Sequence, residues 1–205
     1  MPIDPSVAAK PAAKDEEAPG AGLIIERLFR SRQLQLSGPV DDKLASRIVA
    51  QLLALEAEDK SEPITIFLNS PGGSVSAGFA IYDTMRFIEP AVRVVCTGLT
   101  ASIATVILLG ADKKDRLAMP NTRLLIHQPM IPGTVFGPAS DLEITANELI
   151  KTRAKVNRML AEQTGQPLER VEGDTQRDYW MDADEAVAYG LISRVIESRA
   201  DIAAR

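Results

Sequence analysis

The chain has 205 residues, of which 45% are hydrophobic, a net charge of −5 and one cysteine. This is enough for one sizeable core in a single domain, but a net negative charge without a concentrated basic face argues against nucleic acid as a main partner. One cysteine excludes an intramolecular disulfide and suits a reducing compartment. The first residues, which include Pro2, Asp4 and Pro5, lack the apolar run of a signal peptide, so we expect a cytoplasmic protein.

The amino-terminal region divides into an extension and the first regular elements. Residues 1–22 are rich in alanine, proline and charge and have no apolar period, so we expect disorder there. Residues 23–29 have the pattern of a short amphipathic helix, and the alternation at 34–36 predicts a strand. Asp41 or Asp42 can cap the next helix, whose apolar residues recur at helical spacing: Leu44, Ile48, Leu52 and Leu55.

The middle of the chain alternates between strand and helix patterns. Residues 64–68 alternate as a strand does, 71–73 form a Pro-Gly-Gly turn, and 79–87 predict a helix. Residues 94–109 then predict an apolar strand, a tight turn at Gly98 and a buried helix. This order of elements is typical of an α/β fold.

The same apolar run, extended to residues 94–111, carries no charge and is long enough for a transmembrane interpretation. A strand, a turn and a buried helix account for it equally well, and polar or small residues interrupt it, so we expect no membrane span. Cys96 lies inside the predicted strand. We expect it to be a core residue rather than a nucleophile, because no group nearby would lower its pKa.

A serine needs a base to take its proton, and at neutral pH that base is most often histidine. His127 is the only histidine of the chain, so any serine chemistry with a histidine base must use it. Ser102 is the matching serine, because it stands where the strand ends and a helix with unpaired amides begins. The sequence pattern alone does not identify the carboxylate that would orient the histidine, because Asp174, Asp178 and Asp182 all remain candidates.

The last third of the chain contains a long helical pattern over residues 140–164 that is stopped by Gly165. Its apolar residues are too scattered for one core-facing stripe, so we expect the helix to reach beyond the domain. A solvated surface helix is the alternative. Asp182 and Glu185 then predict a capping box for a helix ending at Gly190, followed by a final strand at 191–196.

Four segments resemble the motifs of ClpP, the proteolytic subunit of the Clp protease. Residues 98–104 are similar to its serine motif, 119–129 to its histidine motif, 69–75 to its oxyanion loop and 174–178 to its aspartate segment. The likeness covers residues 34–196 in order. It implies an α/β, ClpP/crotonase-like fold of repeated β-β-α units, in which the long helix is the protruding handle that stacks two seven-membered rings.

The resemblance also implies the domain limits and the site. Residues 23–198 would form a single ClpP-like serine peptidase domain, with 1–22 as a possible propeptide and 199–205 as a tail. The implied triad is Ser102, His127 and Asp178, and the amides of Gly72 and Ile103 would form the oxyanion hole. No metal or cofactor is implied.

The implied function is a serine endopeptidase that cleaves unfolded proteins and peptides inside a double-ring chamber fed by a hexameric Clp-type ATPase. A second ClpP-type subunit in a mixed ring is a further possible partner. Two alternatives belong to other classes of protein. One is a catalytically silent scaffold subunit of a mixed ring, and the other is a crotonase-like acyl-CoA enzyme, which would not need the serine and histidine pair.

The chain departs from the family pattern in three places. Residues 130–137 stand where the family has a short Gly-Gly turn, and they are two residues longer than that turn. Pro132 has no N–H to donate to a bound peptide. We therefore expect an altered preference among small peptide substrates. Some of residues 1–22 is expected to be removed by the enzyme itself. Gln176 stands before Arg177 where the family has an acid at its ring-ring contact, which predicts weaker stacking of rings.

Overall fold

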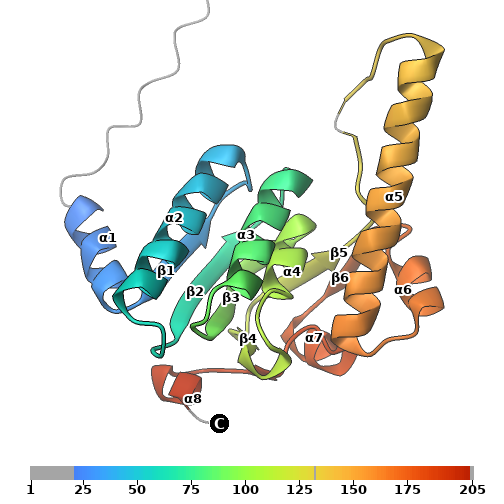
Figure 1. Cartoon of the computed structure of the whole chain (residues 1–205). Coiled ribbons are helices and arrows are strands. Elements are labelled where there is room, and N and C mark those ends of the chain that lie inside the picture. Colours follow the sequence, from blue (N-terminus) through green and yellow to red (C-terminus); the bar gives the residue numbers. More distant parts are fainter. Residues whose placement is uncertain (1–20, 132, 204–205) are drawn as a thin grey trace, which may run out of the picture.

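A computed structural model describes residues 21–131 and 133–203 of the chain. The predicted α/β class is confirmed, because helices cover a mainly parallel seven-stranded sheet (Figure 1). The strands are β1 (Gln33–Ser37), β2 (Ile64–Ser70), β3 (Val92–Ala101), β4 (Arg116–Ala118), β5 (Arg123–Ile126), β6 (Tyr179–Met181) and β7 (Arg194–Val195). The described α-helices are α1 (Ala21–Arg30), α2 (Asp42–Glu58), α3 (Val75–Phe87), α4 (Ile103–Leu108), α5 (Ala139–Thr164), α6 (Leu168–Asp174), α7 (Ala183–Tyr189) and α8 (Arg199–Ala203).

The sheet runs in the order β1-β2-β3-β4-β7, and β5 and β6 extend from the carboxyl-terminal part of β3. The tight turn predicted at Gly98 is wrong. β3 continues through Gly98, which has φ 56°, and changes its neighbour there from β4 to β5. The side chain of Asn69 supports this bulge, since its Oδ1 accepts the N–H of Leu99 at 3.1 Å. A glycine suits the position because left-handed backbone is strained for other residues.

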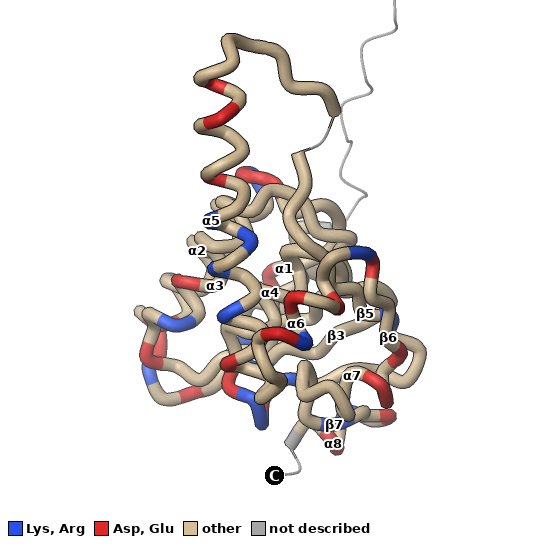
Figure 2. The backbone as a smooth tube through the Cα atoms, turned by 90° about the vertical axis from the view of Figure 1, so that its right-hand side faces the viewer, with Lys and Arg blue, Asp and Glu red and all other residues tan. Residues whose placement is uncertain are grey.

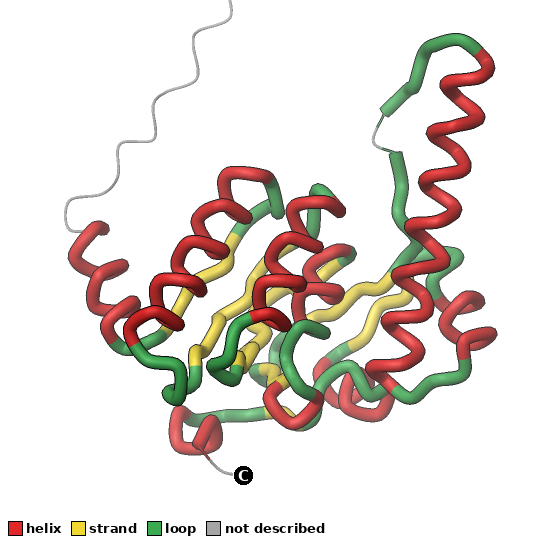
Figure 3. Tube along the Cα trace, in the orientation of Figure 1, coloured by secondary structure: helices red, strands yellow, loops and turns green. Residues whose placement is uncertain are grey.

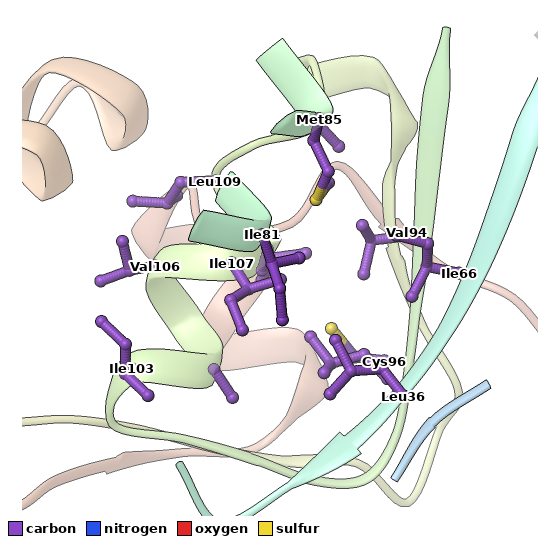
Figure 4. Close-up of a cluster of buried hydrophobic side chains, with 14 of the residues drawn as sticks. Leu36, Ile66, Ile81, Met85, Val94, Cys96, Ile103, Val106, Ile107 and Leu109 are labelled. Atoms are coloured by element: carbon purple, nitrogen blue, oxygen red, sulfur yellow. The ribbon is translucent and has the colours of Figure 1, made fainter. Parts of the chain in front are cut away.

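The main core lies between the sheet and the helices α2, α3 and α4, which line up across one face of the sheet (Figures 1 and 3). Figure 4 shows side chains of β1–β3 facing those of α3 and α4. The predicted apolar stripe of α2 is buried, and Asp41 caps that helix by accepting the N–H of Leu44 at 2.7 Å. Cys96 is a core residue, as expected, and burial raises the pKa of its thiol to about 12.

The helix α5 extends far beyond the rest of the molecule (Figure 1), as the sequence pattern predicts. It has 26 residues and so is about 39 Å long. Its buried residues lie in the carboxyl-terminal half, whereas Ile144 and Ile150 in the other half are each 62% exposed. Acidic residues lie near the free end of α5 and basic residues nearer the sheet (Figure 2). We call the protruding amino-terminal half of α5 the handle.

Arg116 ties the base of α5 to α4. Its guanidinium is buried and donates to the backbone carbonyls of Leu109 and Ala111 after α4, and to Gln163 in the last turn of α5. The carbonyls of Leu109 and Gln163 lie at helix ends and lack intrahelical donors, so a cation stabilises them. Burial lowers the pKa of Arg116 to about 10, which still leaves it charged at neutral pH.

Several boundaries differ from the sequence expectations. The helix expected at 79–87 begins at Val75, where Ser74 caps it, and the strand expected at 191–196 is only Arg194–Val195. Residues 199–203, expected as a tail, form α8, and both α6 and β6 were not predicted. The helix expected at 23–29 is present as α1. The extension expected at 1–22 falls mostly on residues 1–20, which lie outside the described residues.

The uncharged run at 94–111 is divided between β3 and α4. Of the helices that the structure describes, none combines the length and the apolar character that crossing a bilayer requires.

Candidate active site

Ser102 stands between β3 and α4, at a sharp change of chain direction. It has φ 58° and ψ −127°, and Arg32 is the only other non-glycine residue with positive φ in the described part of the chain. Such backbone costs about 1–3 kcal/mol and persists only where neighbouring contacts impose it. Here the Ser102 N–H donates to Leu125 O at 2.9 Å, and the Thr105 hydroxyl donates to Ser102 O at 2.6 Å.

His127 follows β5, which lies parallel to the end of β3 with Leu125 opposite Ala101. The carboxyl ends of the two strands therefore meet, and the His127 side chain reaches Ser102. Its Nε2 lies 2.8 Å from Ser102 Oγ. The ring is mostly buried, with a side-chain exposure of 13%.

Asp178 precedes β6, which is antiparallel to β5 with Tyr179 opposite Ile126. This register places Asp178 directly across from His127, and its Oδ1 lies 3.1 Å from His127 Nδ1. Of the three aspartates that the sequence left open, Asp178 is the one in contact with the histidine. Asp174 instead accepts from the Tyr189 hydroxyl at 3.0 Å, and Asp182 caps α7.

Gly72 lies against the nucleophile candidate. It has φ 92°, and a Cβ placed there would be 2.6 Å from the Cβ of Ser102. The loop is fixed by Val40, whose N–H donates to Gly72 O at 2.9 Å and whose carbonyl accepts the Ser74 N–H at 2.7 Å. The N–H of Gly72 itself donates to the side chain of Ser70 at 3.1 Å.

Ile103, the second residue assigned to the oxyanion hole, is the first residue of α4. An amide in the first turn of a helix has no intrahelical acceptor, so it can serve a ligand oxygen. The neighbouring pocket has a volume of about 20 Å³. Its lining is mainly apolar and consists of Val75, Ser102, Ile103, Thr105, Val106, Ile126, His127, Pro129, Val156 and Leu160.

The segment that carries Asp178 is held by side chains that the sequence analysis did not single out. Gln128 donates from its backbone N–H to Thr175 O at 2.6 Å and from its side chain to Gln176 O at 2.9 Å. The Thr175 hydroxyl donates to Oδ1 of the buried Asn157 at 3.0 Å, which connects this segment to α5. Gln128 lies in the histidine motif and Ser70 in the oxyanion motif, so their place in these motifs is the sequence feature that could have identified both residues.

Gln176 and Arg177, the residues assigned to a ring-ring contact, are exposed. Arg177 donates to the backbone carbonyl of Gln176 at 3.4 Å. Residues 133–137 lead toward the free end of α5 (Figure 1), and Phe136 among them is 89% exposed. Pro132 lies outside the described residues.

A serine, a histidine and an aspartate joined in this order on an α/β fold are the arrangement found in serine hydrolases. The sequence model of the family described as Clp protease matches residues 16–199, which is most of the chain. The chain therefore belongs to the Clp protease family, and it is a ClpP-type peptidase. The resemblance drawn from the four motifs is confirmed at the level of the family.

Proposed function

We propose that this protein is a serine endopeptidase whose nucleophile is Ser102. The observation that carries the proposal is the continuous chain of contacts from Ser102 Oγ to His127 Nε2 at 2.8 Å, and from His127 Nδ1 to Asp178 Oδ1 at 3.1 Å. With its proton on Nδ1, the imidazole donates to Asp178 and accepts from Ser102. That tautomer is the one that a general base requires.

The proposed reaction is acyl transfer from a peptide to water. Ser102 Oγ attacks the peptide carbonyl while His127 takes the hydroxyl proton, and His127 then gives that proton to the leaving amine. Water attacks the resulting ester with His127 again as base, which releases the acid and restores Ser102. The amides of Gly72 and Ile103 are the proposed donors to the oxyanion. No step calls for a metal or cofactor.

The proposed setting is a chamber of two stacked heptameric rings in the cytoplasm. The Clp protease family generally forms oligomers and works with Clp ATPases, which supports a hexameric ATPase that delivers unfolded chains. The exposed Ile144 and Ile150 on the handle support contacts with another subunit, because large apolar side chains on a protruding helix favour burial. Gln176 and Arg177 are proposed to lie at the ring-ring contact. The proposal also includes a second ClpP-type subunit as a partner in a mixed ring.

Two other functions would place different demands on the site. A catalytically silent scaffold subunit would not need the Ser102, His127 and Asp178 contacts, nor the strained backbone at Ser102. A crotonase-like acyl-CoA enzyme has no use for a serine that is hydrogen-bonded to histidine. The contacts at the site favour the peptidase over both.

The test is hydrolysis of a fluorogenic peptide by the assembled protein, with assembly monitored by sedimentation. Wild type should turn over, and Ser102→Ala should lose about 10³-fold or more of kcat, as expected for loss of a serine nucleophile. Ser76→Ala is the matched control, since Ser76 is exposed and contacts only the Ser74 hydroxyl among the described side-chain hydrogen bonds. Equal activity of wild type and Ser102→Ala in the assembled state would refute the proposal.

A further inference from the structure

Ser70 is the last residue of β2, and its side chain is fully buried. Its Oγ accepts the N–H of Gly72 at 3.1 Å. This N–H is one of the two donors that the proposed mechanism assigns to the oxyanion. One of the two donors therefore already has an acceptor within the protein before any substrate binds.

We propose that Ser70 is a positioning residue that competes with the oxyanion for the Gly72 amide, and so limits how strongly the site stabilises the transition state. The inference rests on the proposed peptidase function. Ser70, which lies outside the triad, would then affect the rate of acylation through the Gly72 amide. Catalysis increases only with interactions that are stronger in the transition state than in the ground state, and the bond to Ser70 strengthens the ground state.

The loop does not depend on the Ser70 hydroxyl for its position. The backbone of Val40 holds the loop through two hydrogen bonds: its N–H donates to Gly72 O, and its carbonyl accepts the N–H of Ser74. Val40 and Gly73 also form a parallel bridge, and a Cβ at Gly73 would lie 2.3 Å from Val40 O. Removal of the hydroxyl should therefore free the amide while the loop keeps its place.

Burial determines what the freed amide does. Both Gly72 and Ser70 are buried, so bulk water does not readily replace the lost acceptor. In Ser70→Ala the amide would gain a full acceptor only when the oxyanion forms. The hydrogen bond would then act in the transition state alone.

The experiment compares assembled wild type, Ser70→Ala and Ser70→Cys in peptide hydrolysis and in binding of a peptide boronic acid, whose tetrahedral adduct mimics the oxyanion. Ser70→Ala should raise kcat about 3- to 10-fold, the factor that one ordinary hydrogen bond represents, with little change in KM. The boronic acid should bind tighter by a similar factor. Ser70→Cys, of similar size but with a weak acceptor, should change both in the same direction by less. Ser76→Ala, in the first turn of α3 just after the loop, should match wild type.

Unchanged or lowered kcat in folded Ser70→Ala would overturn the competition while leaving the peptidase proposal intact, because wild-type turnover tests that separately. A structure of the wild-type boronic acid adduct tests the claim even where the variants do not fold. The Gly72 N to Ser70 Oγ distance should lengthen beyond hydrogen-bond range as a boronate oxygen approaches the amide. A distance that stays near its present 3.1 Å would overturn the inference.

Discussion

The two halves of the candidate site are built differently. We call β3, α4 and residues 70–74 the nucleophile region, and residues 174–181 the acid region. In the nucleophile region, Ser102 is followed by a fully buried helix and is held in strained backbone by hydrogen bonds from both sides. In the acid region, Asp178 has a side-chain exposure of 60% and follows two exposed residues.

This difference indicates where the site is rigid and where it can respond to assembly. Ser102 and its loop are held directly against the core, because Ser102 is followed by the buried residues of α4 and Gly72 lies against Ser102, so their geometry is set when the chain folds. The acid depends on Gln128, Thr175 and Asn157, which connect it to the histidine segment and to α5. A subunit that contacts the handle or residues 176–177 can therefore shift Asp178 with little effect on Ser102.

Among substitutions outside the triad serine, the largest effect on activity is expected from Gly72→Ala. Its Cβ would lie 2.7 Å from Ala101 O as well as against Ser102, and neither backbone nor core can move away. We expect kcat/KM to fall about 10²- to 10³-fold, the usual loss when an oxyanion donor is misplaced. Gly173→Ala is the matched control on α6, where a Cβ meets no atom within 4 Å. Comparable losses in both variants would contradict the rigidity of the nucleophile region.

Asp178→Asn should have a smaller effect. A buried triad aspartate changed to asparagine costs about 10⁴-fold in kcat because the histidine is held in the wrong tautomer. Asp178 is exposed, so water can replace part of its contact with His127, and we expect a loss of about 10²-fold. The pH profile of kcat/KM should also change in shape. A loss of about 10⁴-fold would show that the acid is buried in the working assembly.

Gln176→Glu should shift the balance between single and double rings. A carboxylate binds a guanidinium more strongly than an amide does, and a double ring repeats the contact many times. We expect a few-fold higher stacked fraction by sedimentation, with activity rising in step. Gln35→Glu adds the same charge on an exposed position of β1 and serves as control. Wild type that is already fully stacked and fully active at low concentration would contradict the prediction.

Cys96 is expected to influence activity least, because it lies inside the nucleophile region but takes no part in the proposed reaction. Burial raises the pKa of its thiol from 9.0 to about 12, so the folded protein should resist alkylation at pH 8 and react only on unfolding. Because the folded pKa is the higher one, the stability from this group is fully present below pH 9 and is lost as the pH rises toward 12. Alkylation of folded protein at the rate of unfolded protein would show that the core opens.

The sequence predicted the nucleophile region better than the acid region. An uninterrupted run of small and aliphatic residues at 101–109 predicted the buried helix α4. Periodicity predicted β2 and α2, because each buries one regular set of apolar residues against the sheet. Residues 168–181 have no such period, so the sequence did not predict α6 and β6, and only the family resemblance selected Asp178. The sequence pattern at Gly98 predicts a turn where the structure has a bulge, because glycine allows positive φ in both and only strand pairing separates the two. The support that Gln128 gives to the acid region depends on a hydrogen bond between residues 48 positions apart, which no local sequence pattern shows.

The most direct measurement is labelling of the assembled protein with a fluorophosphonate, followed by mass spectrometry of its peptides. The probe reacts with a serine only when a base has activated it. The proposed triad predicts one adduct, on the peptide that contains Ser102, and no adduct in Ser102→Ala. Wild type that stays unlabelled when assembled, or that is labelled at another serine, would contradict the account and favour a scaffold subunit or a crotonase-like enzyme.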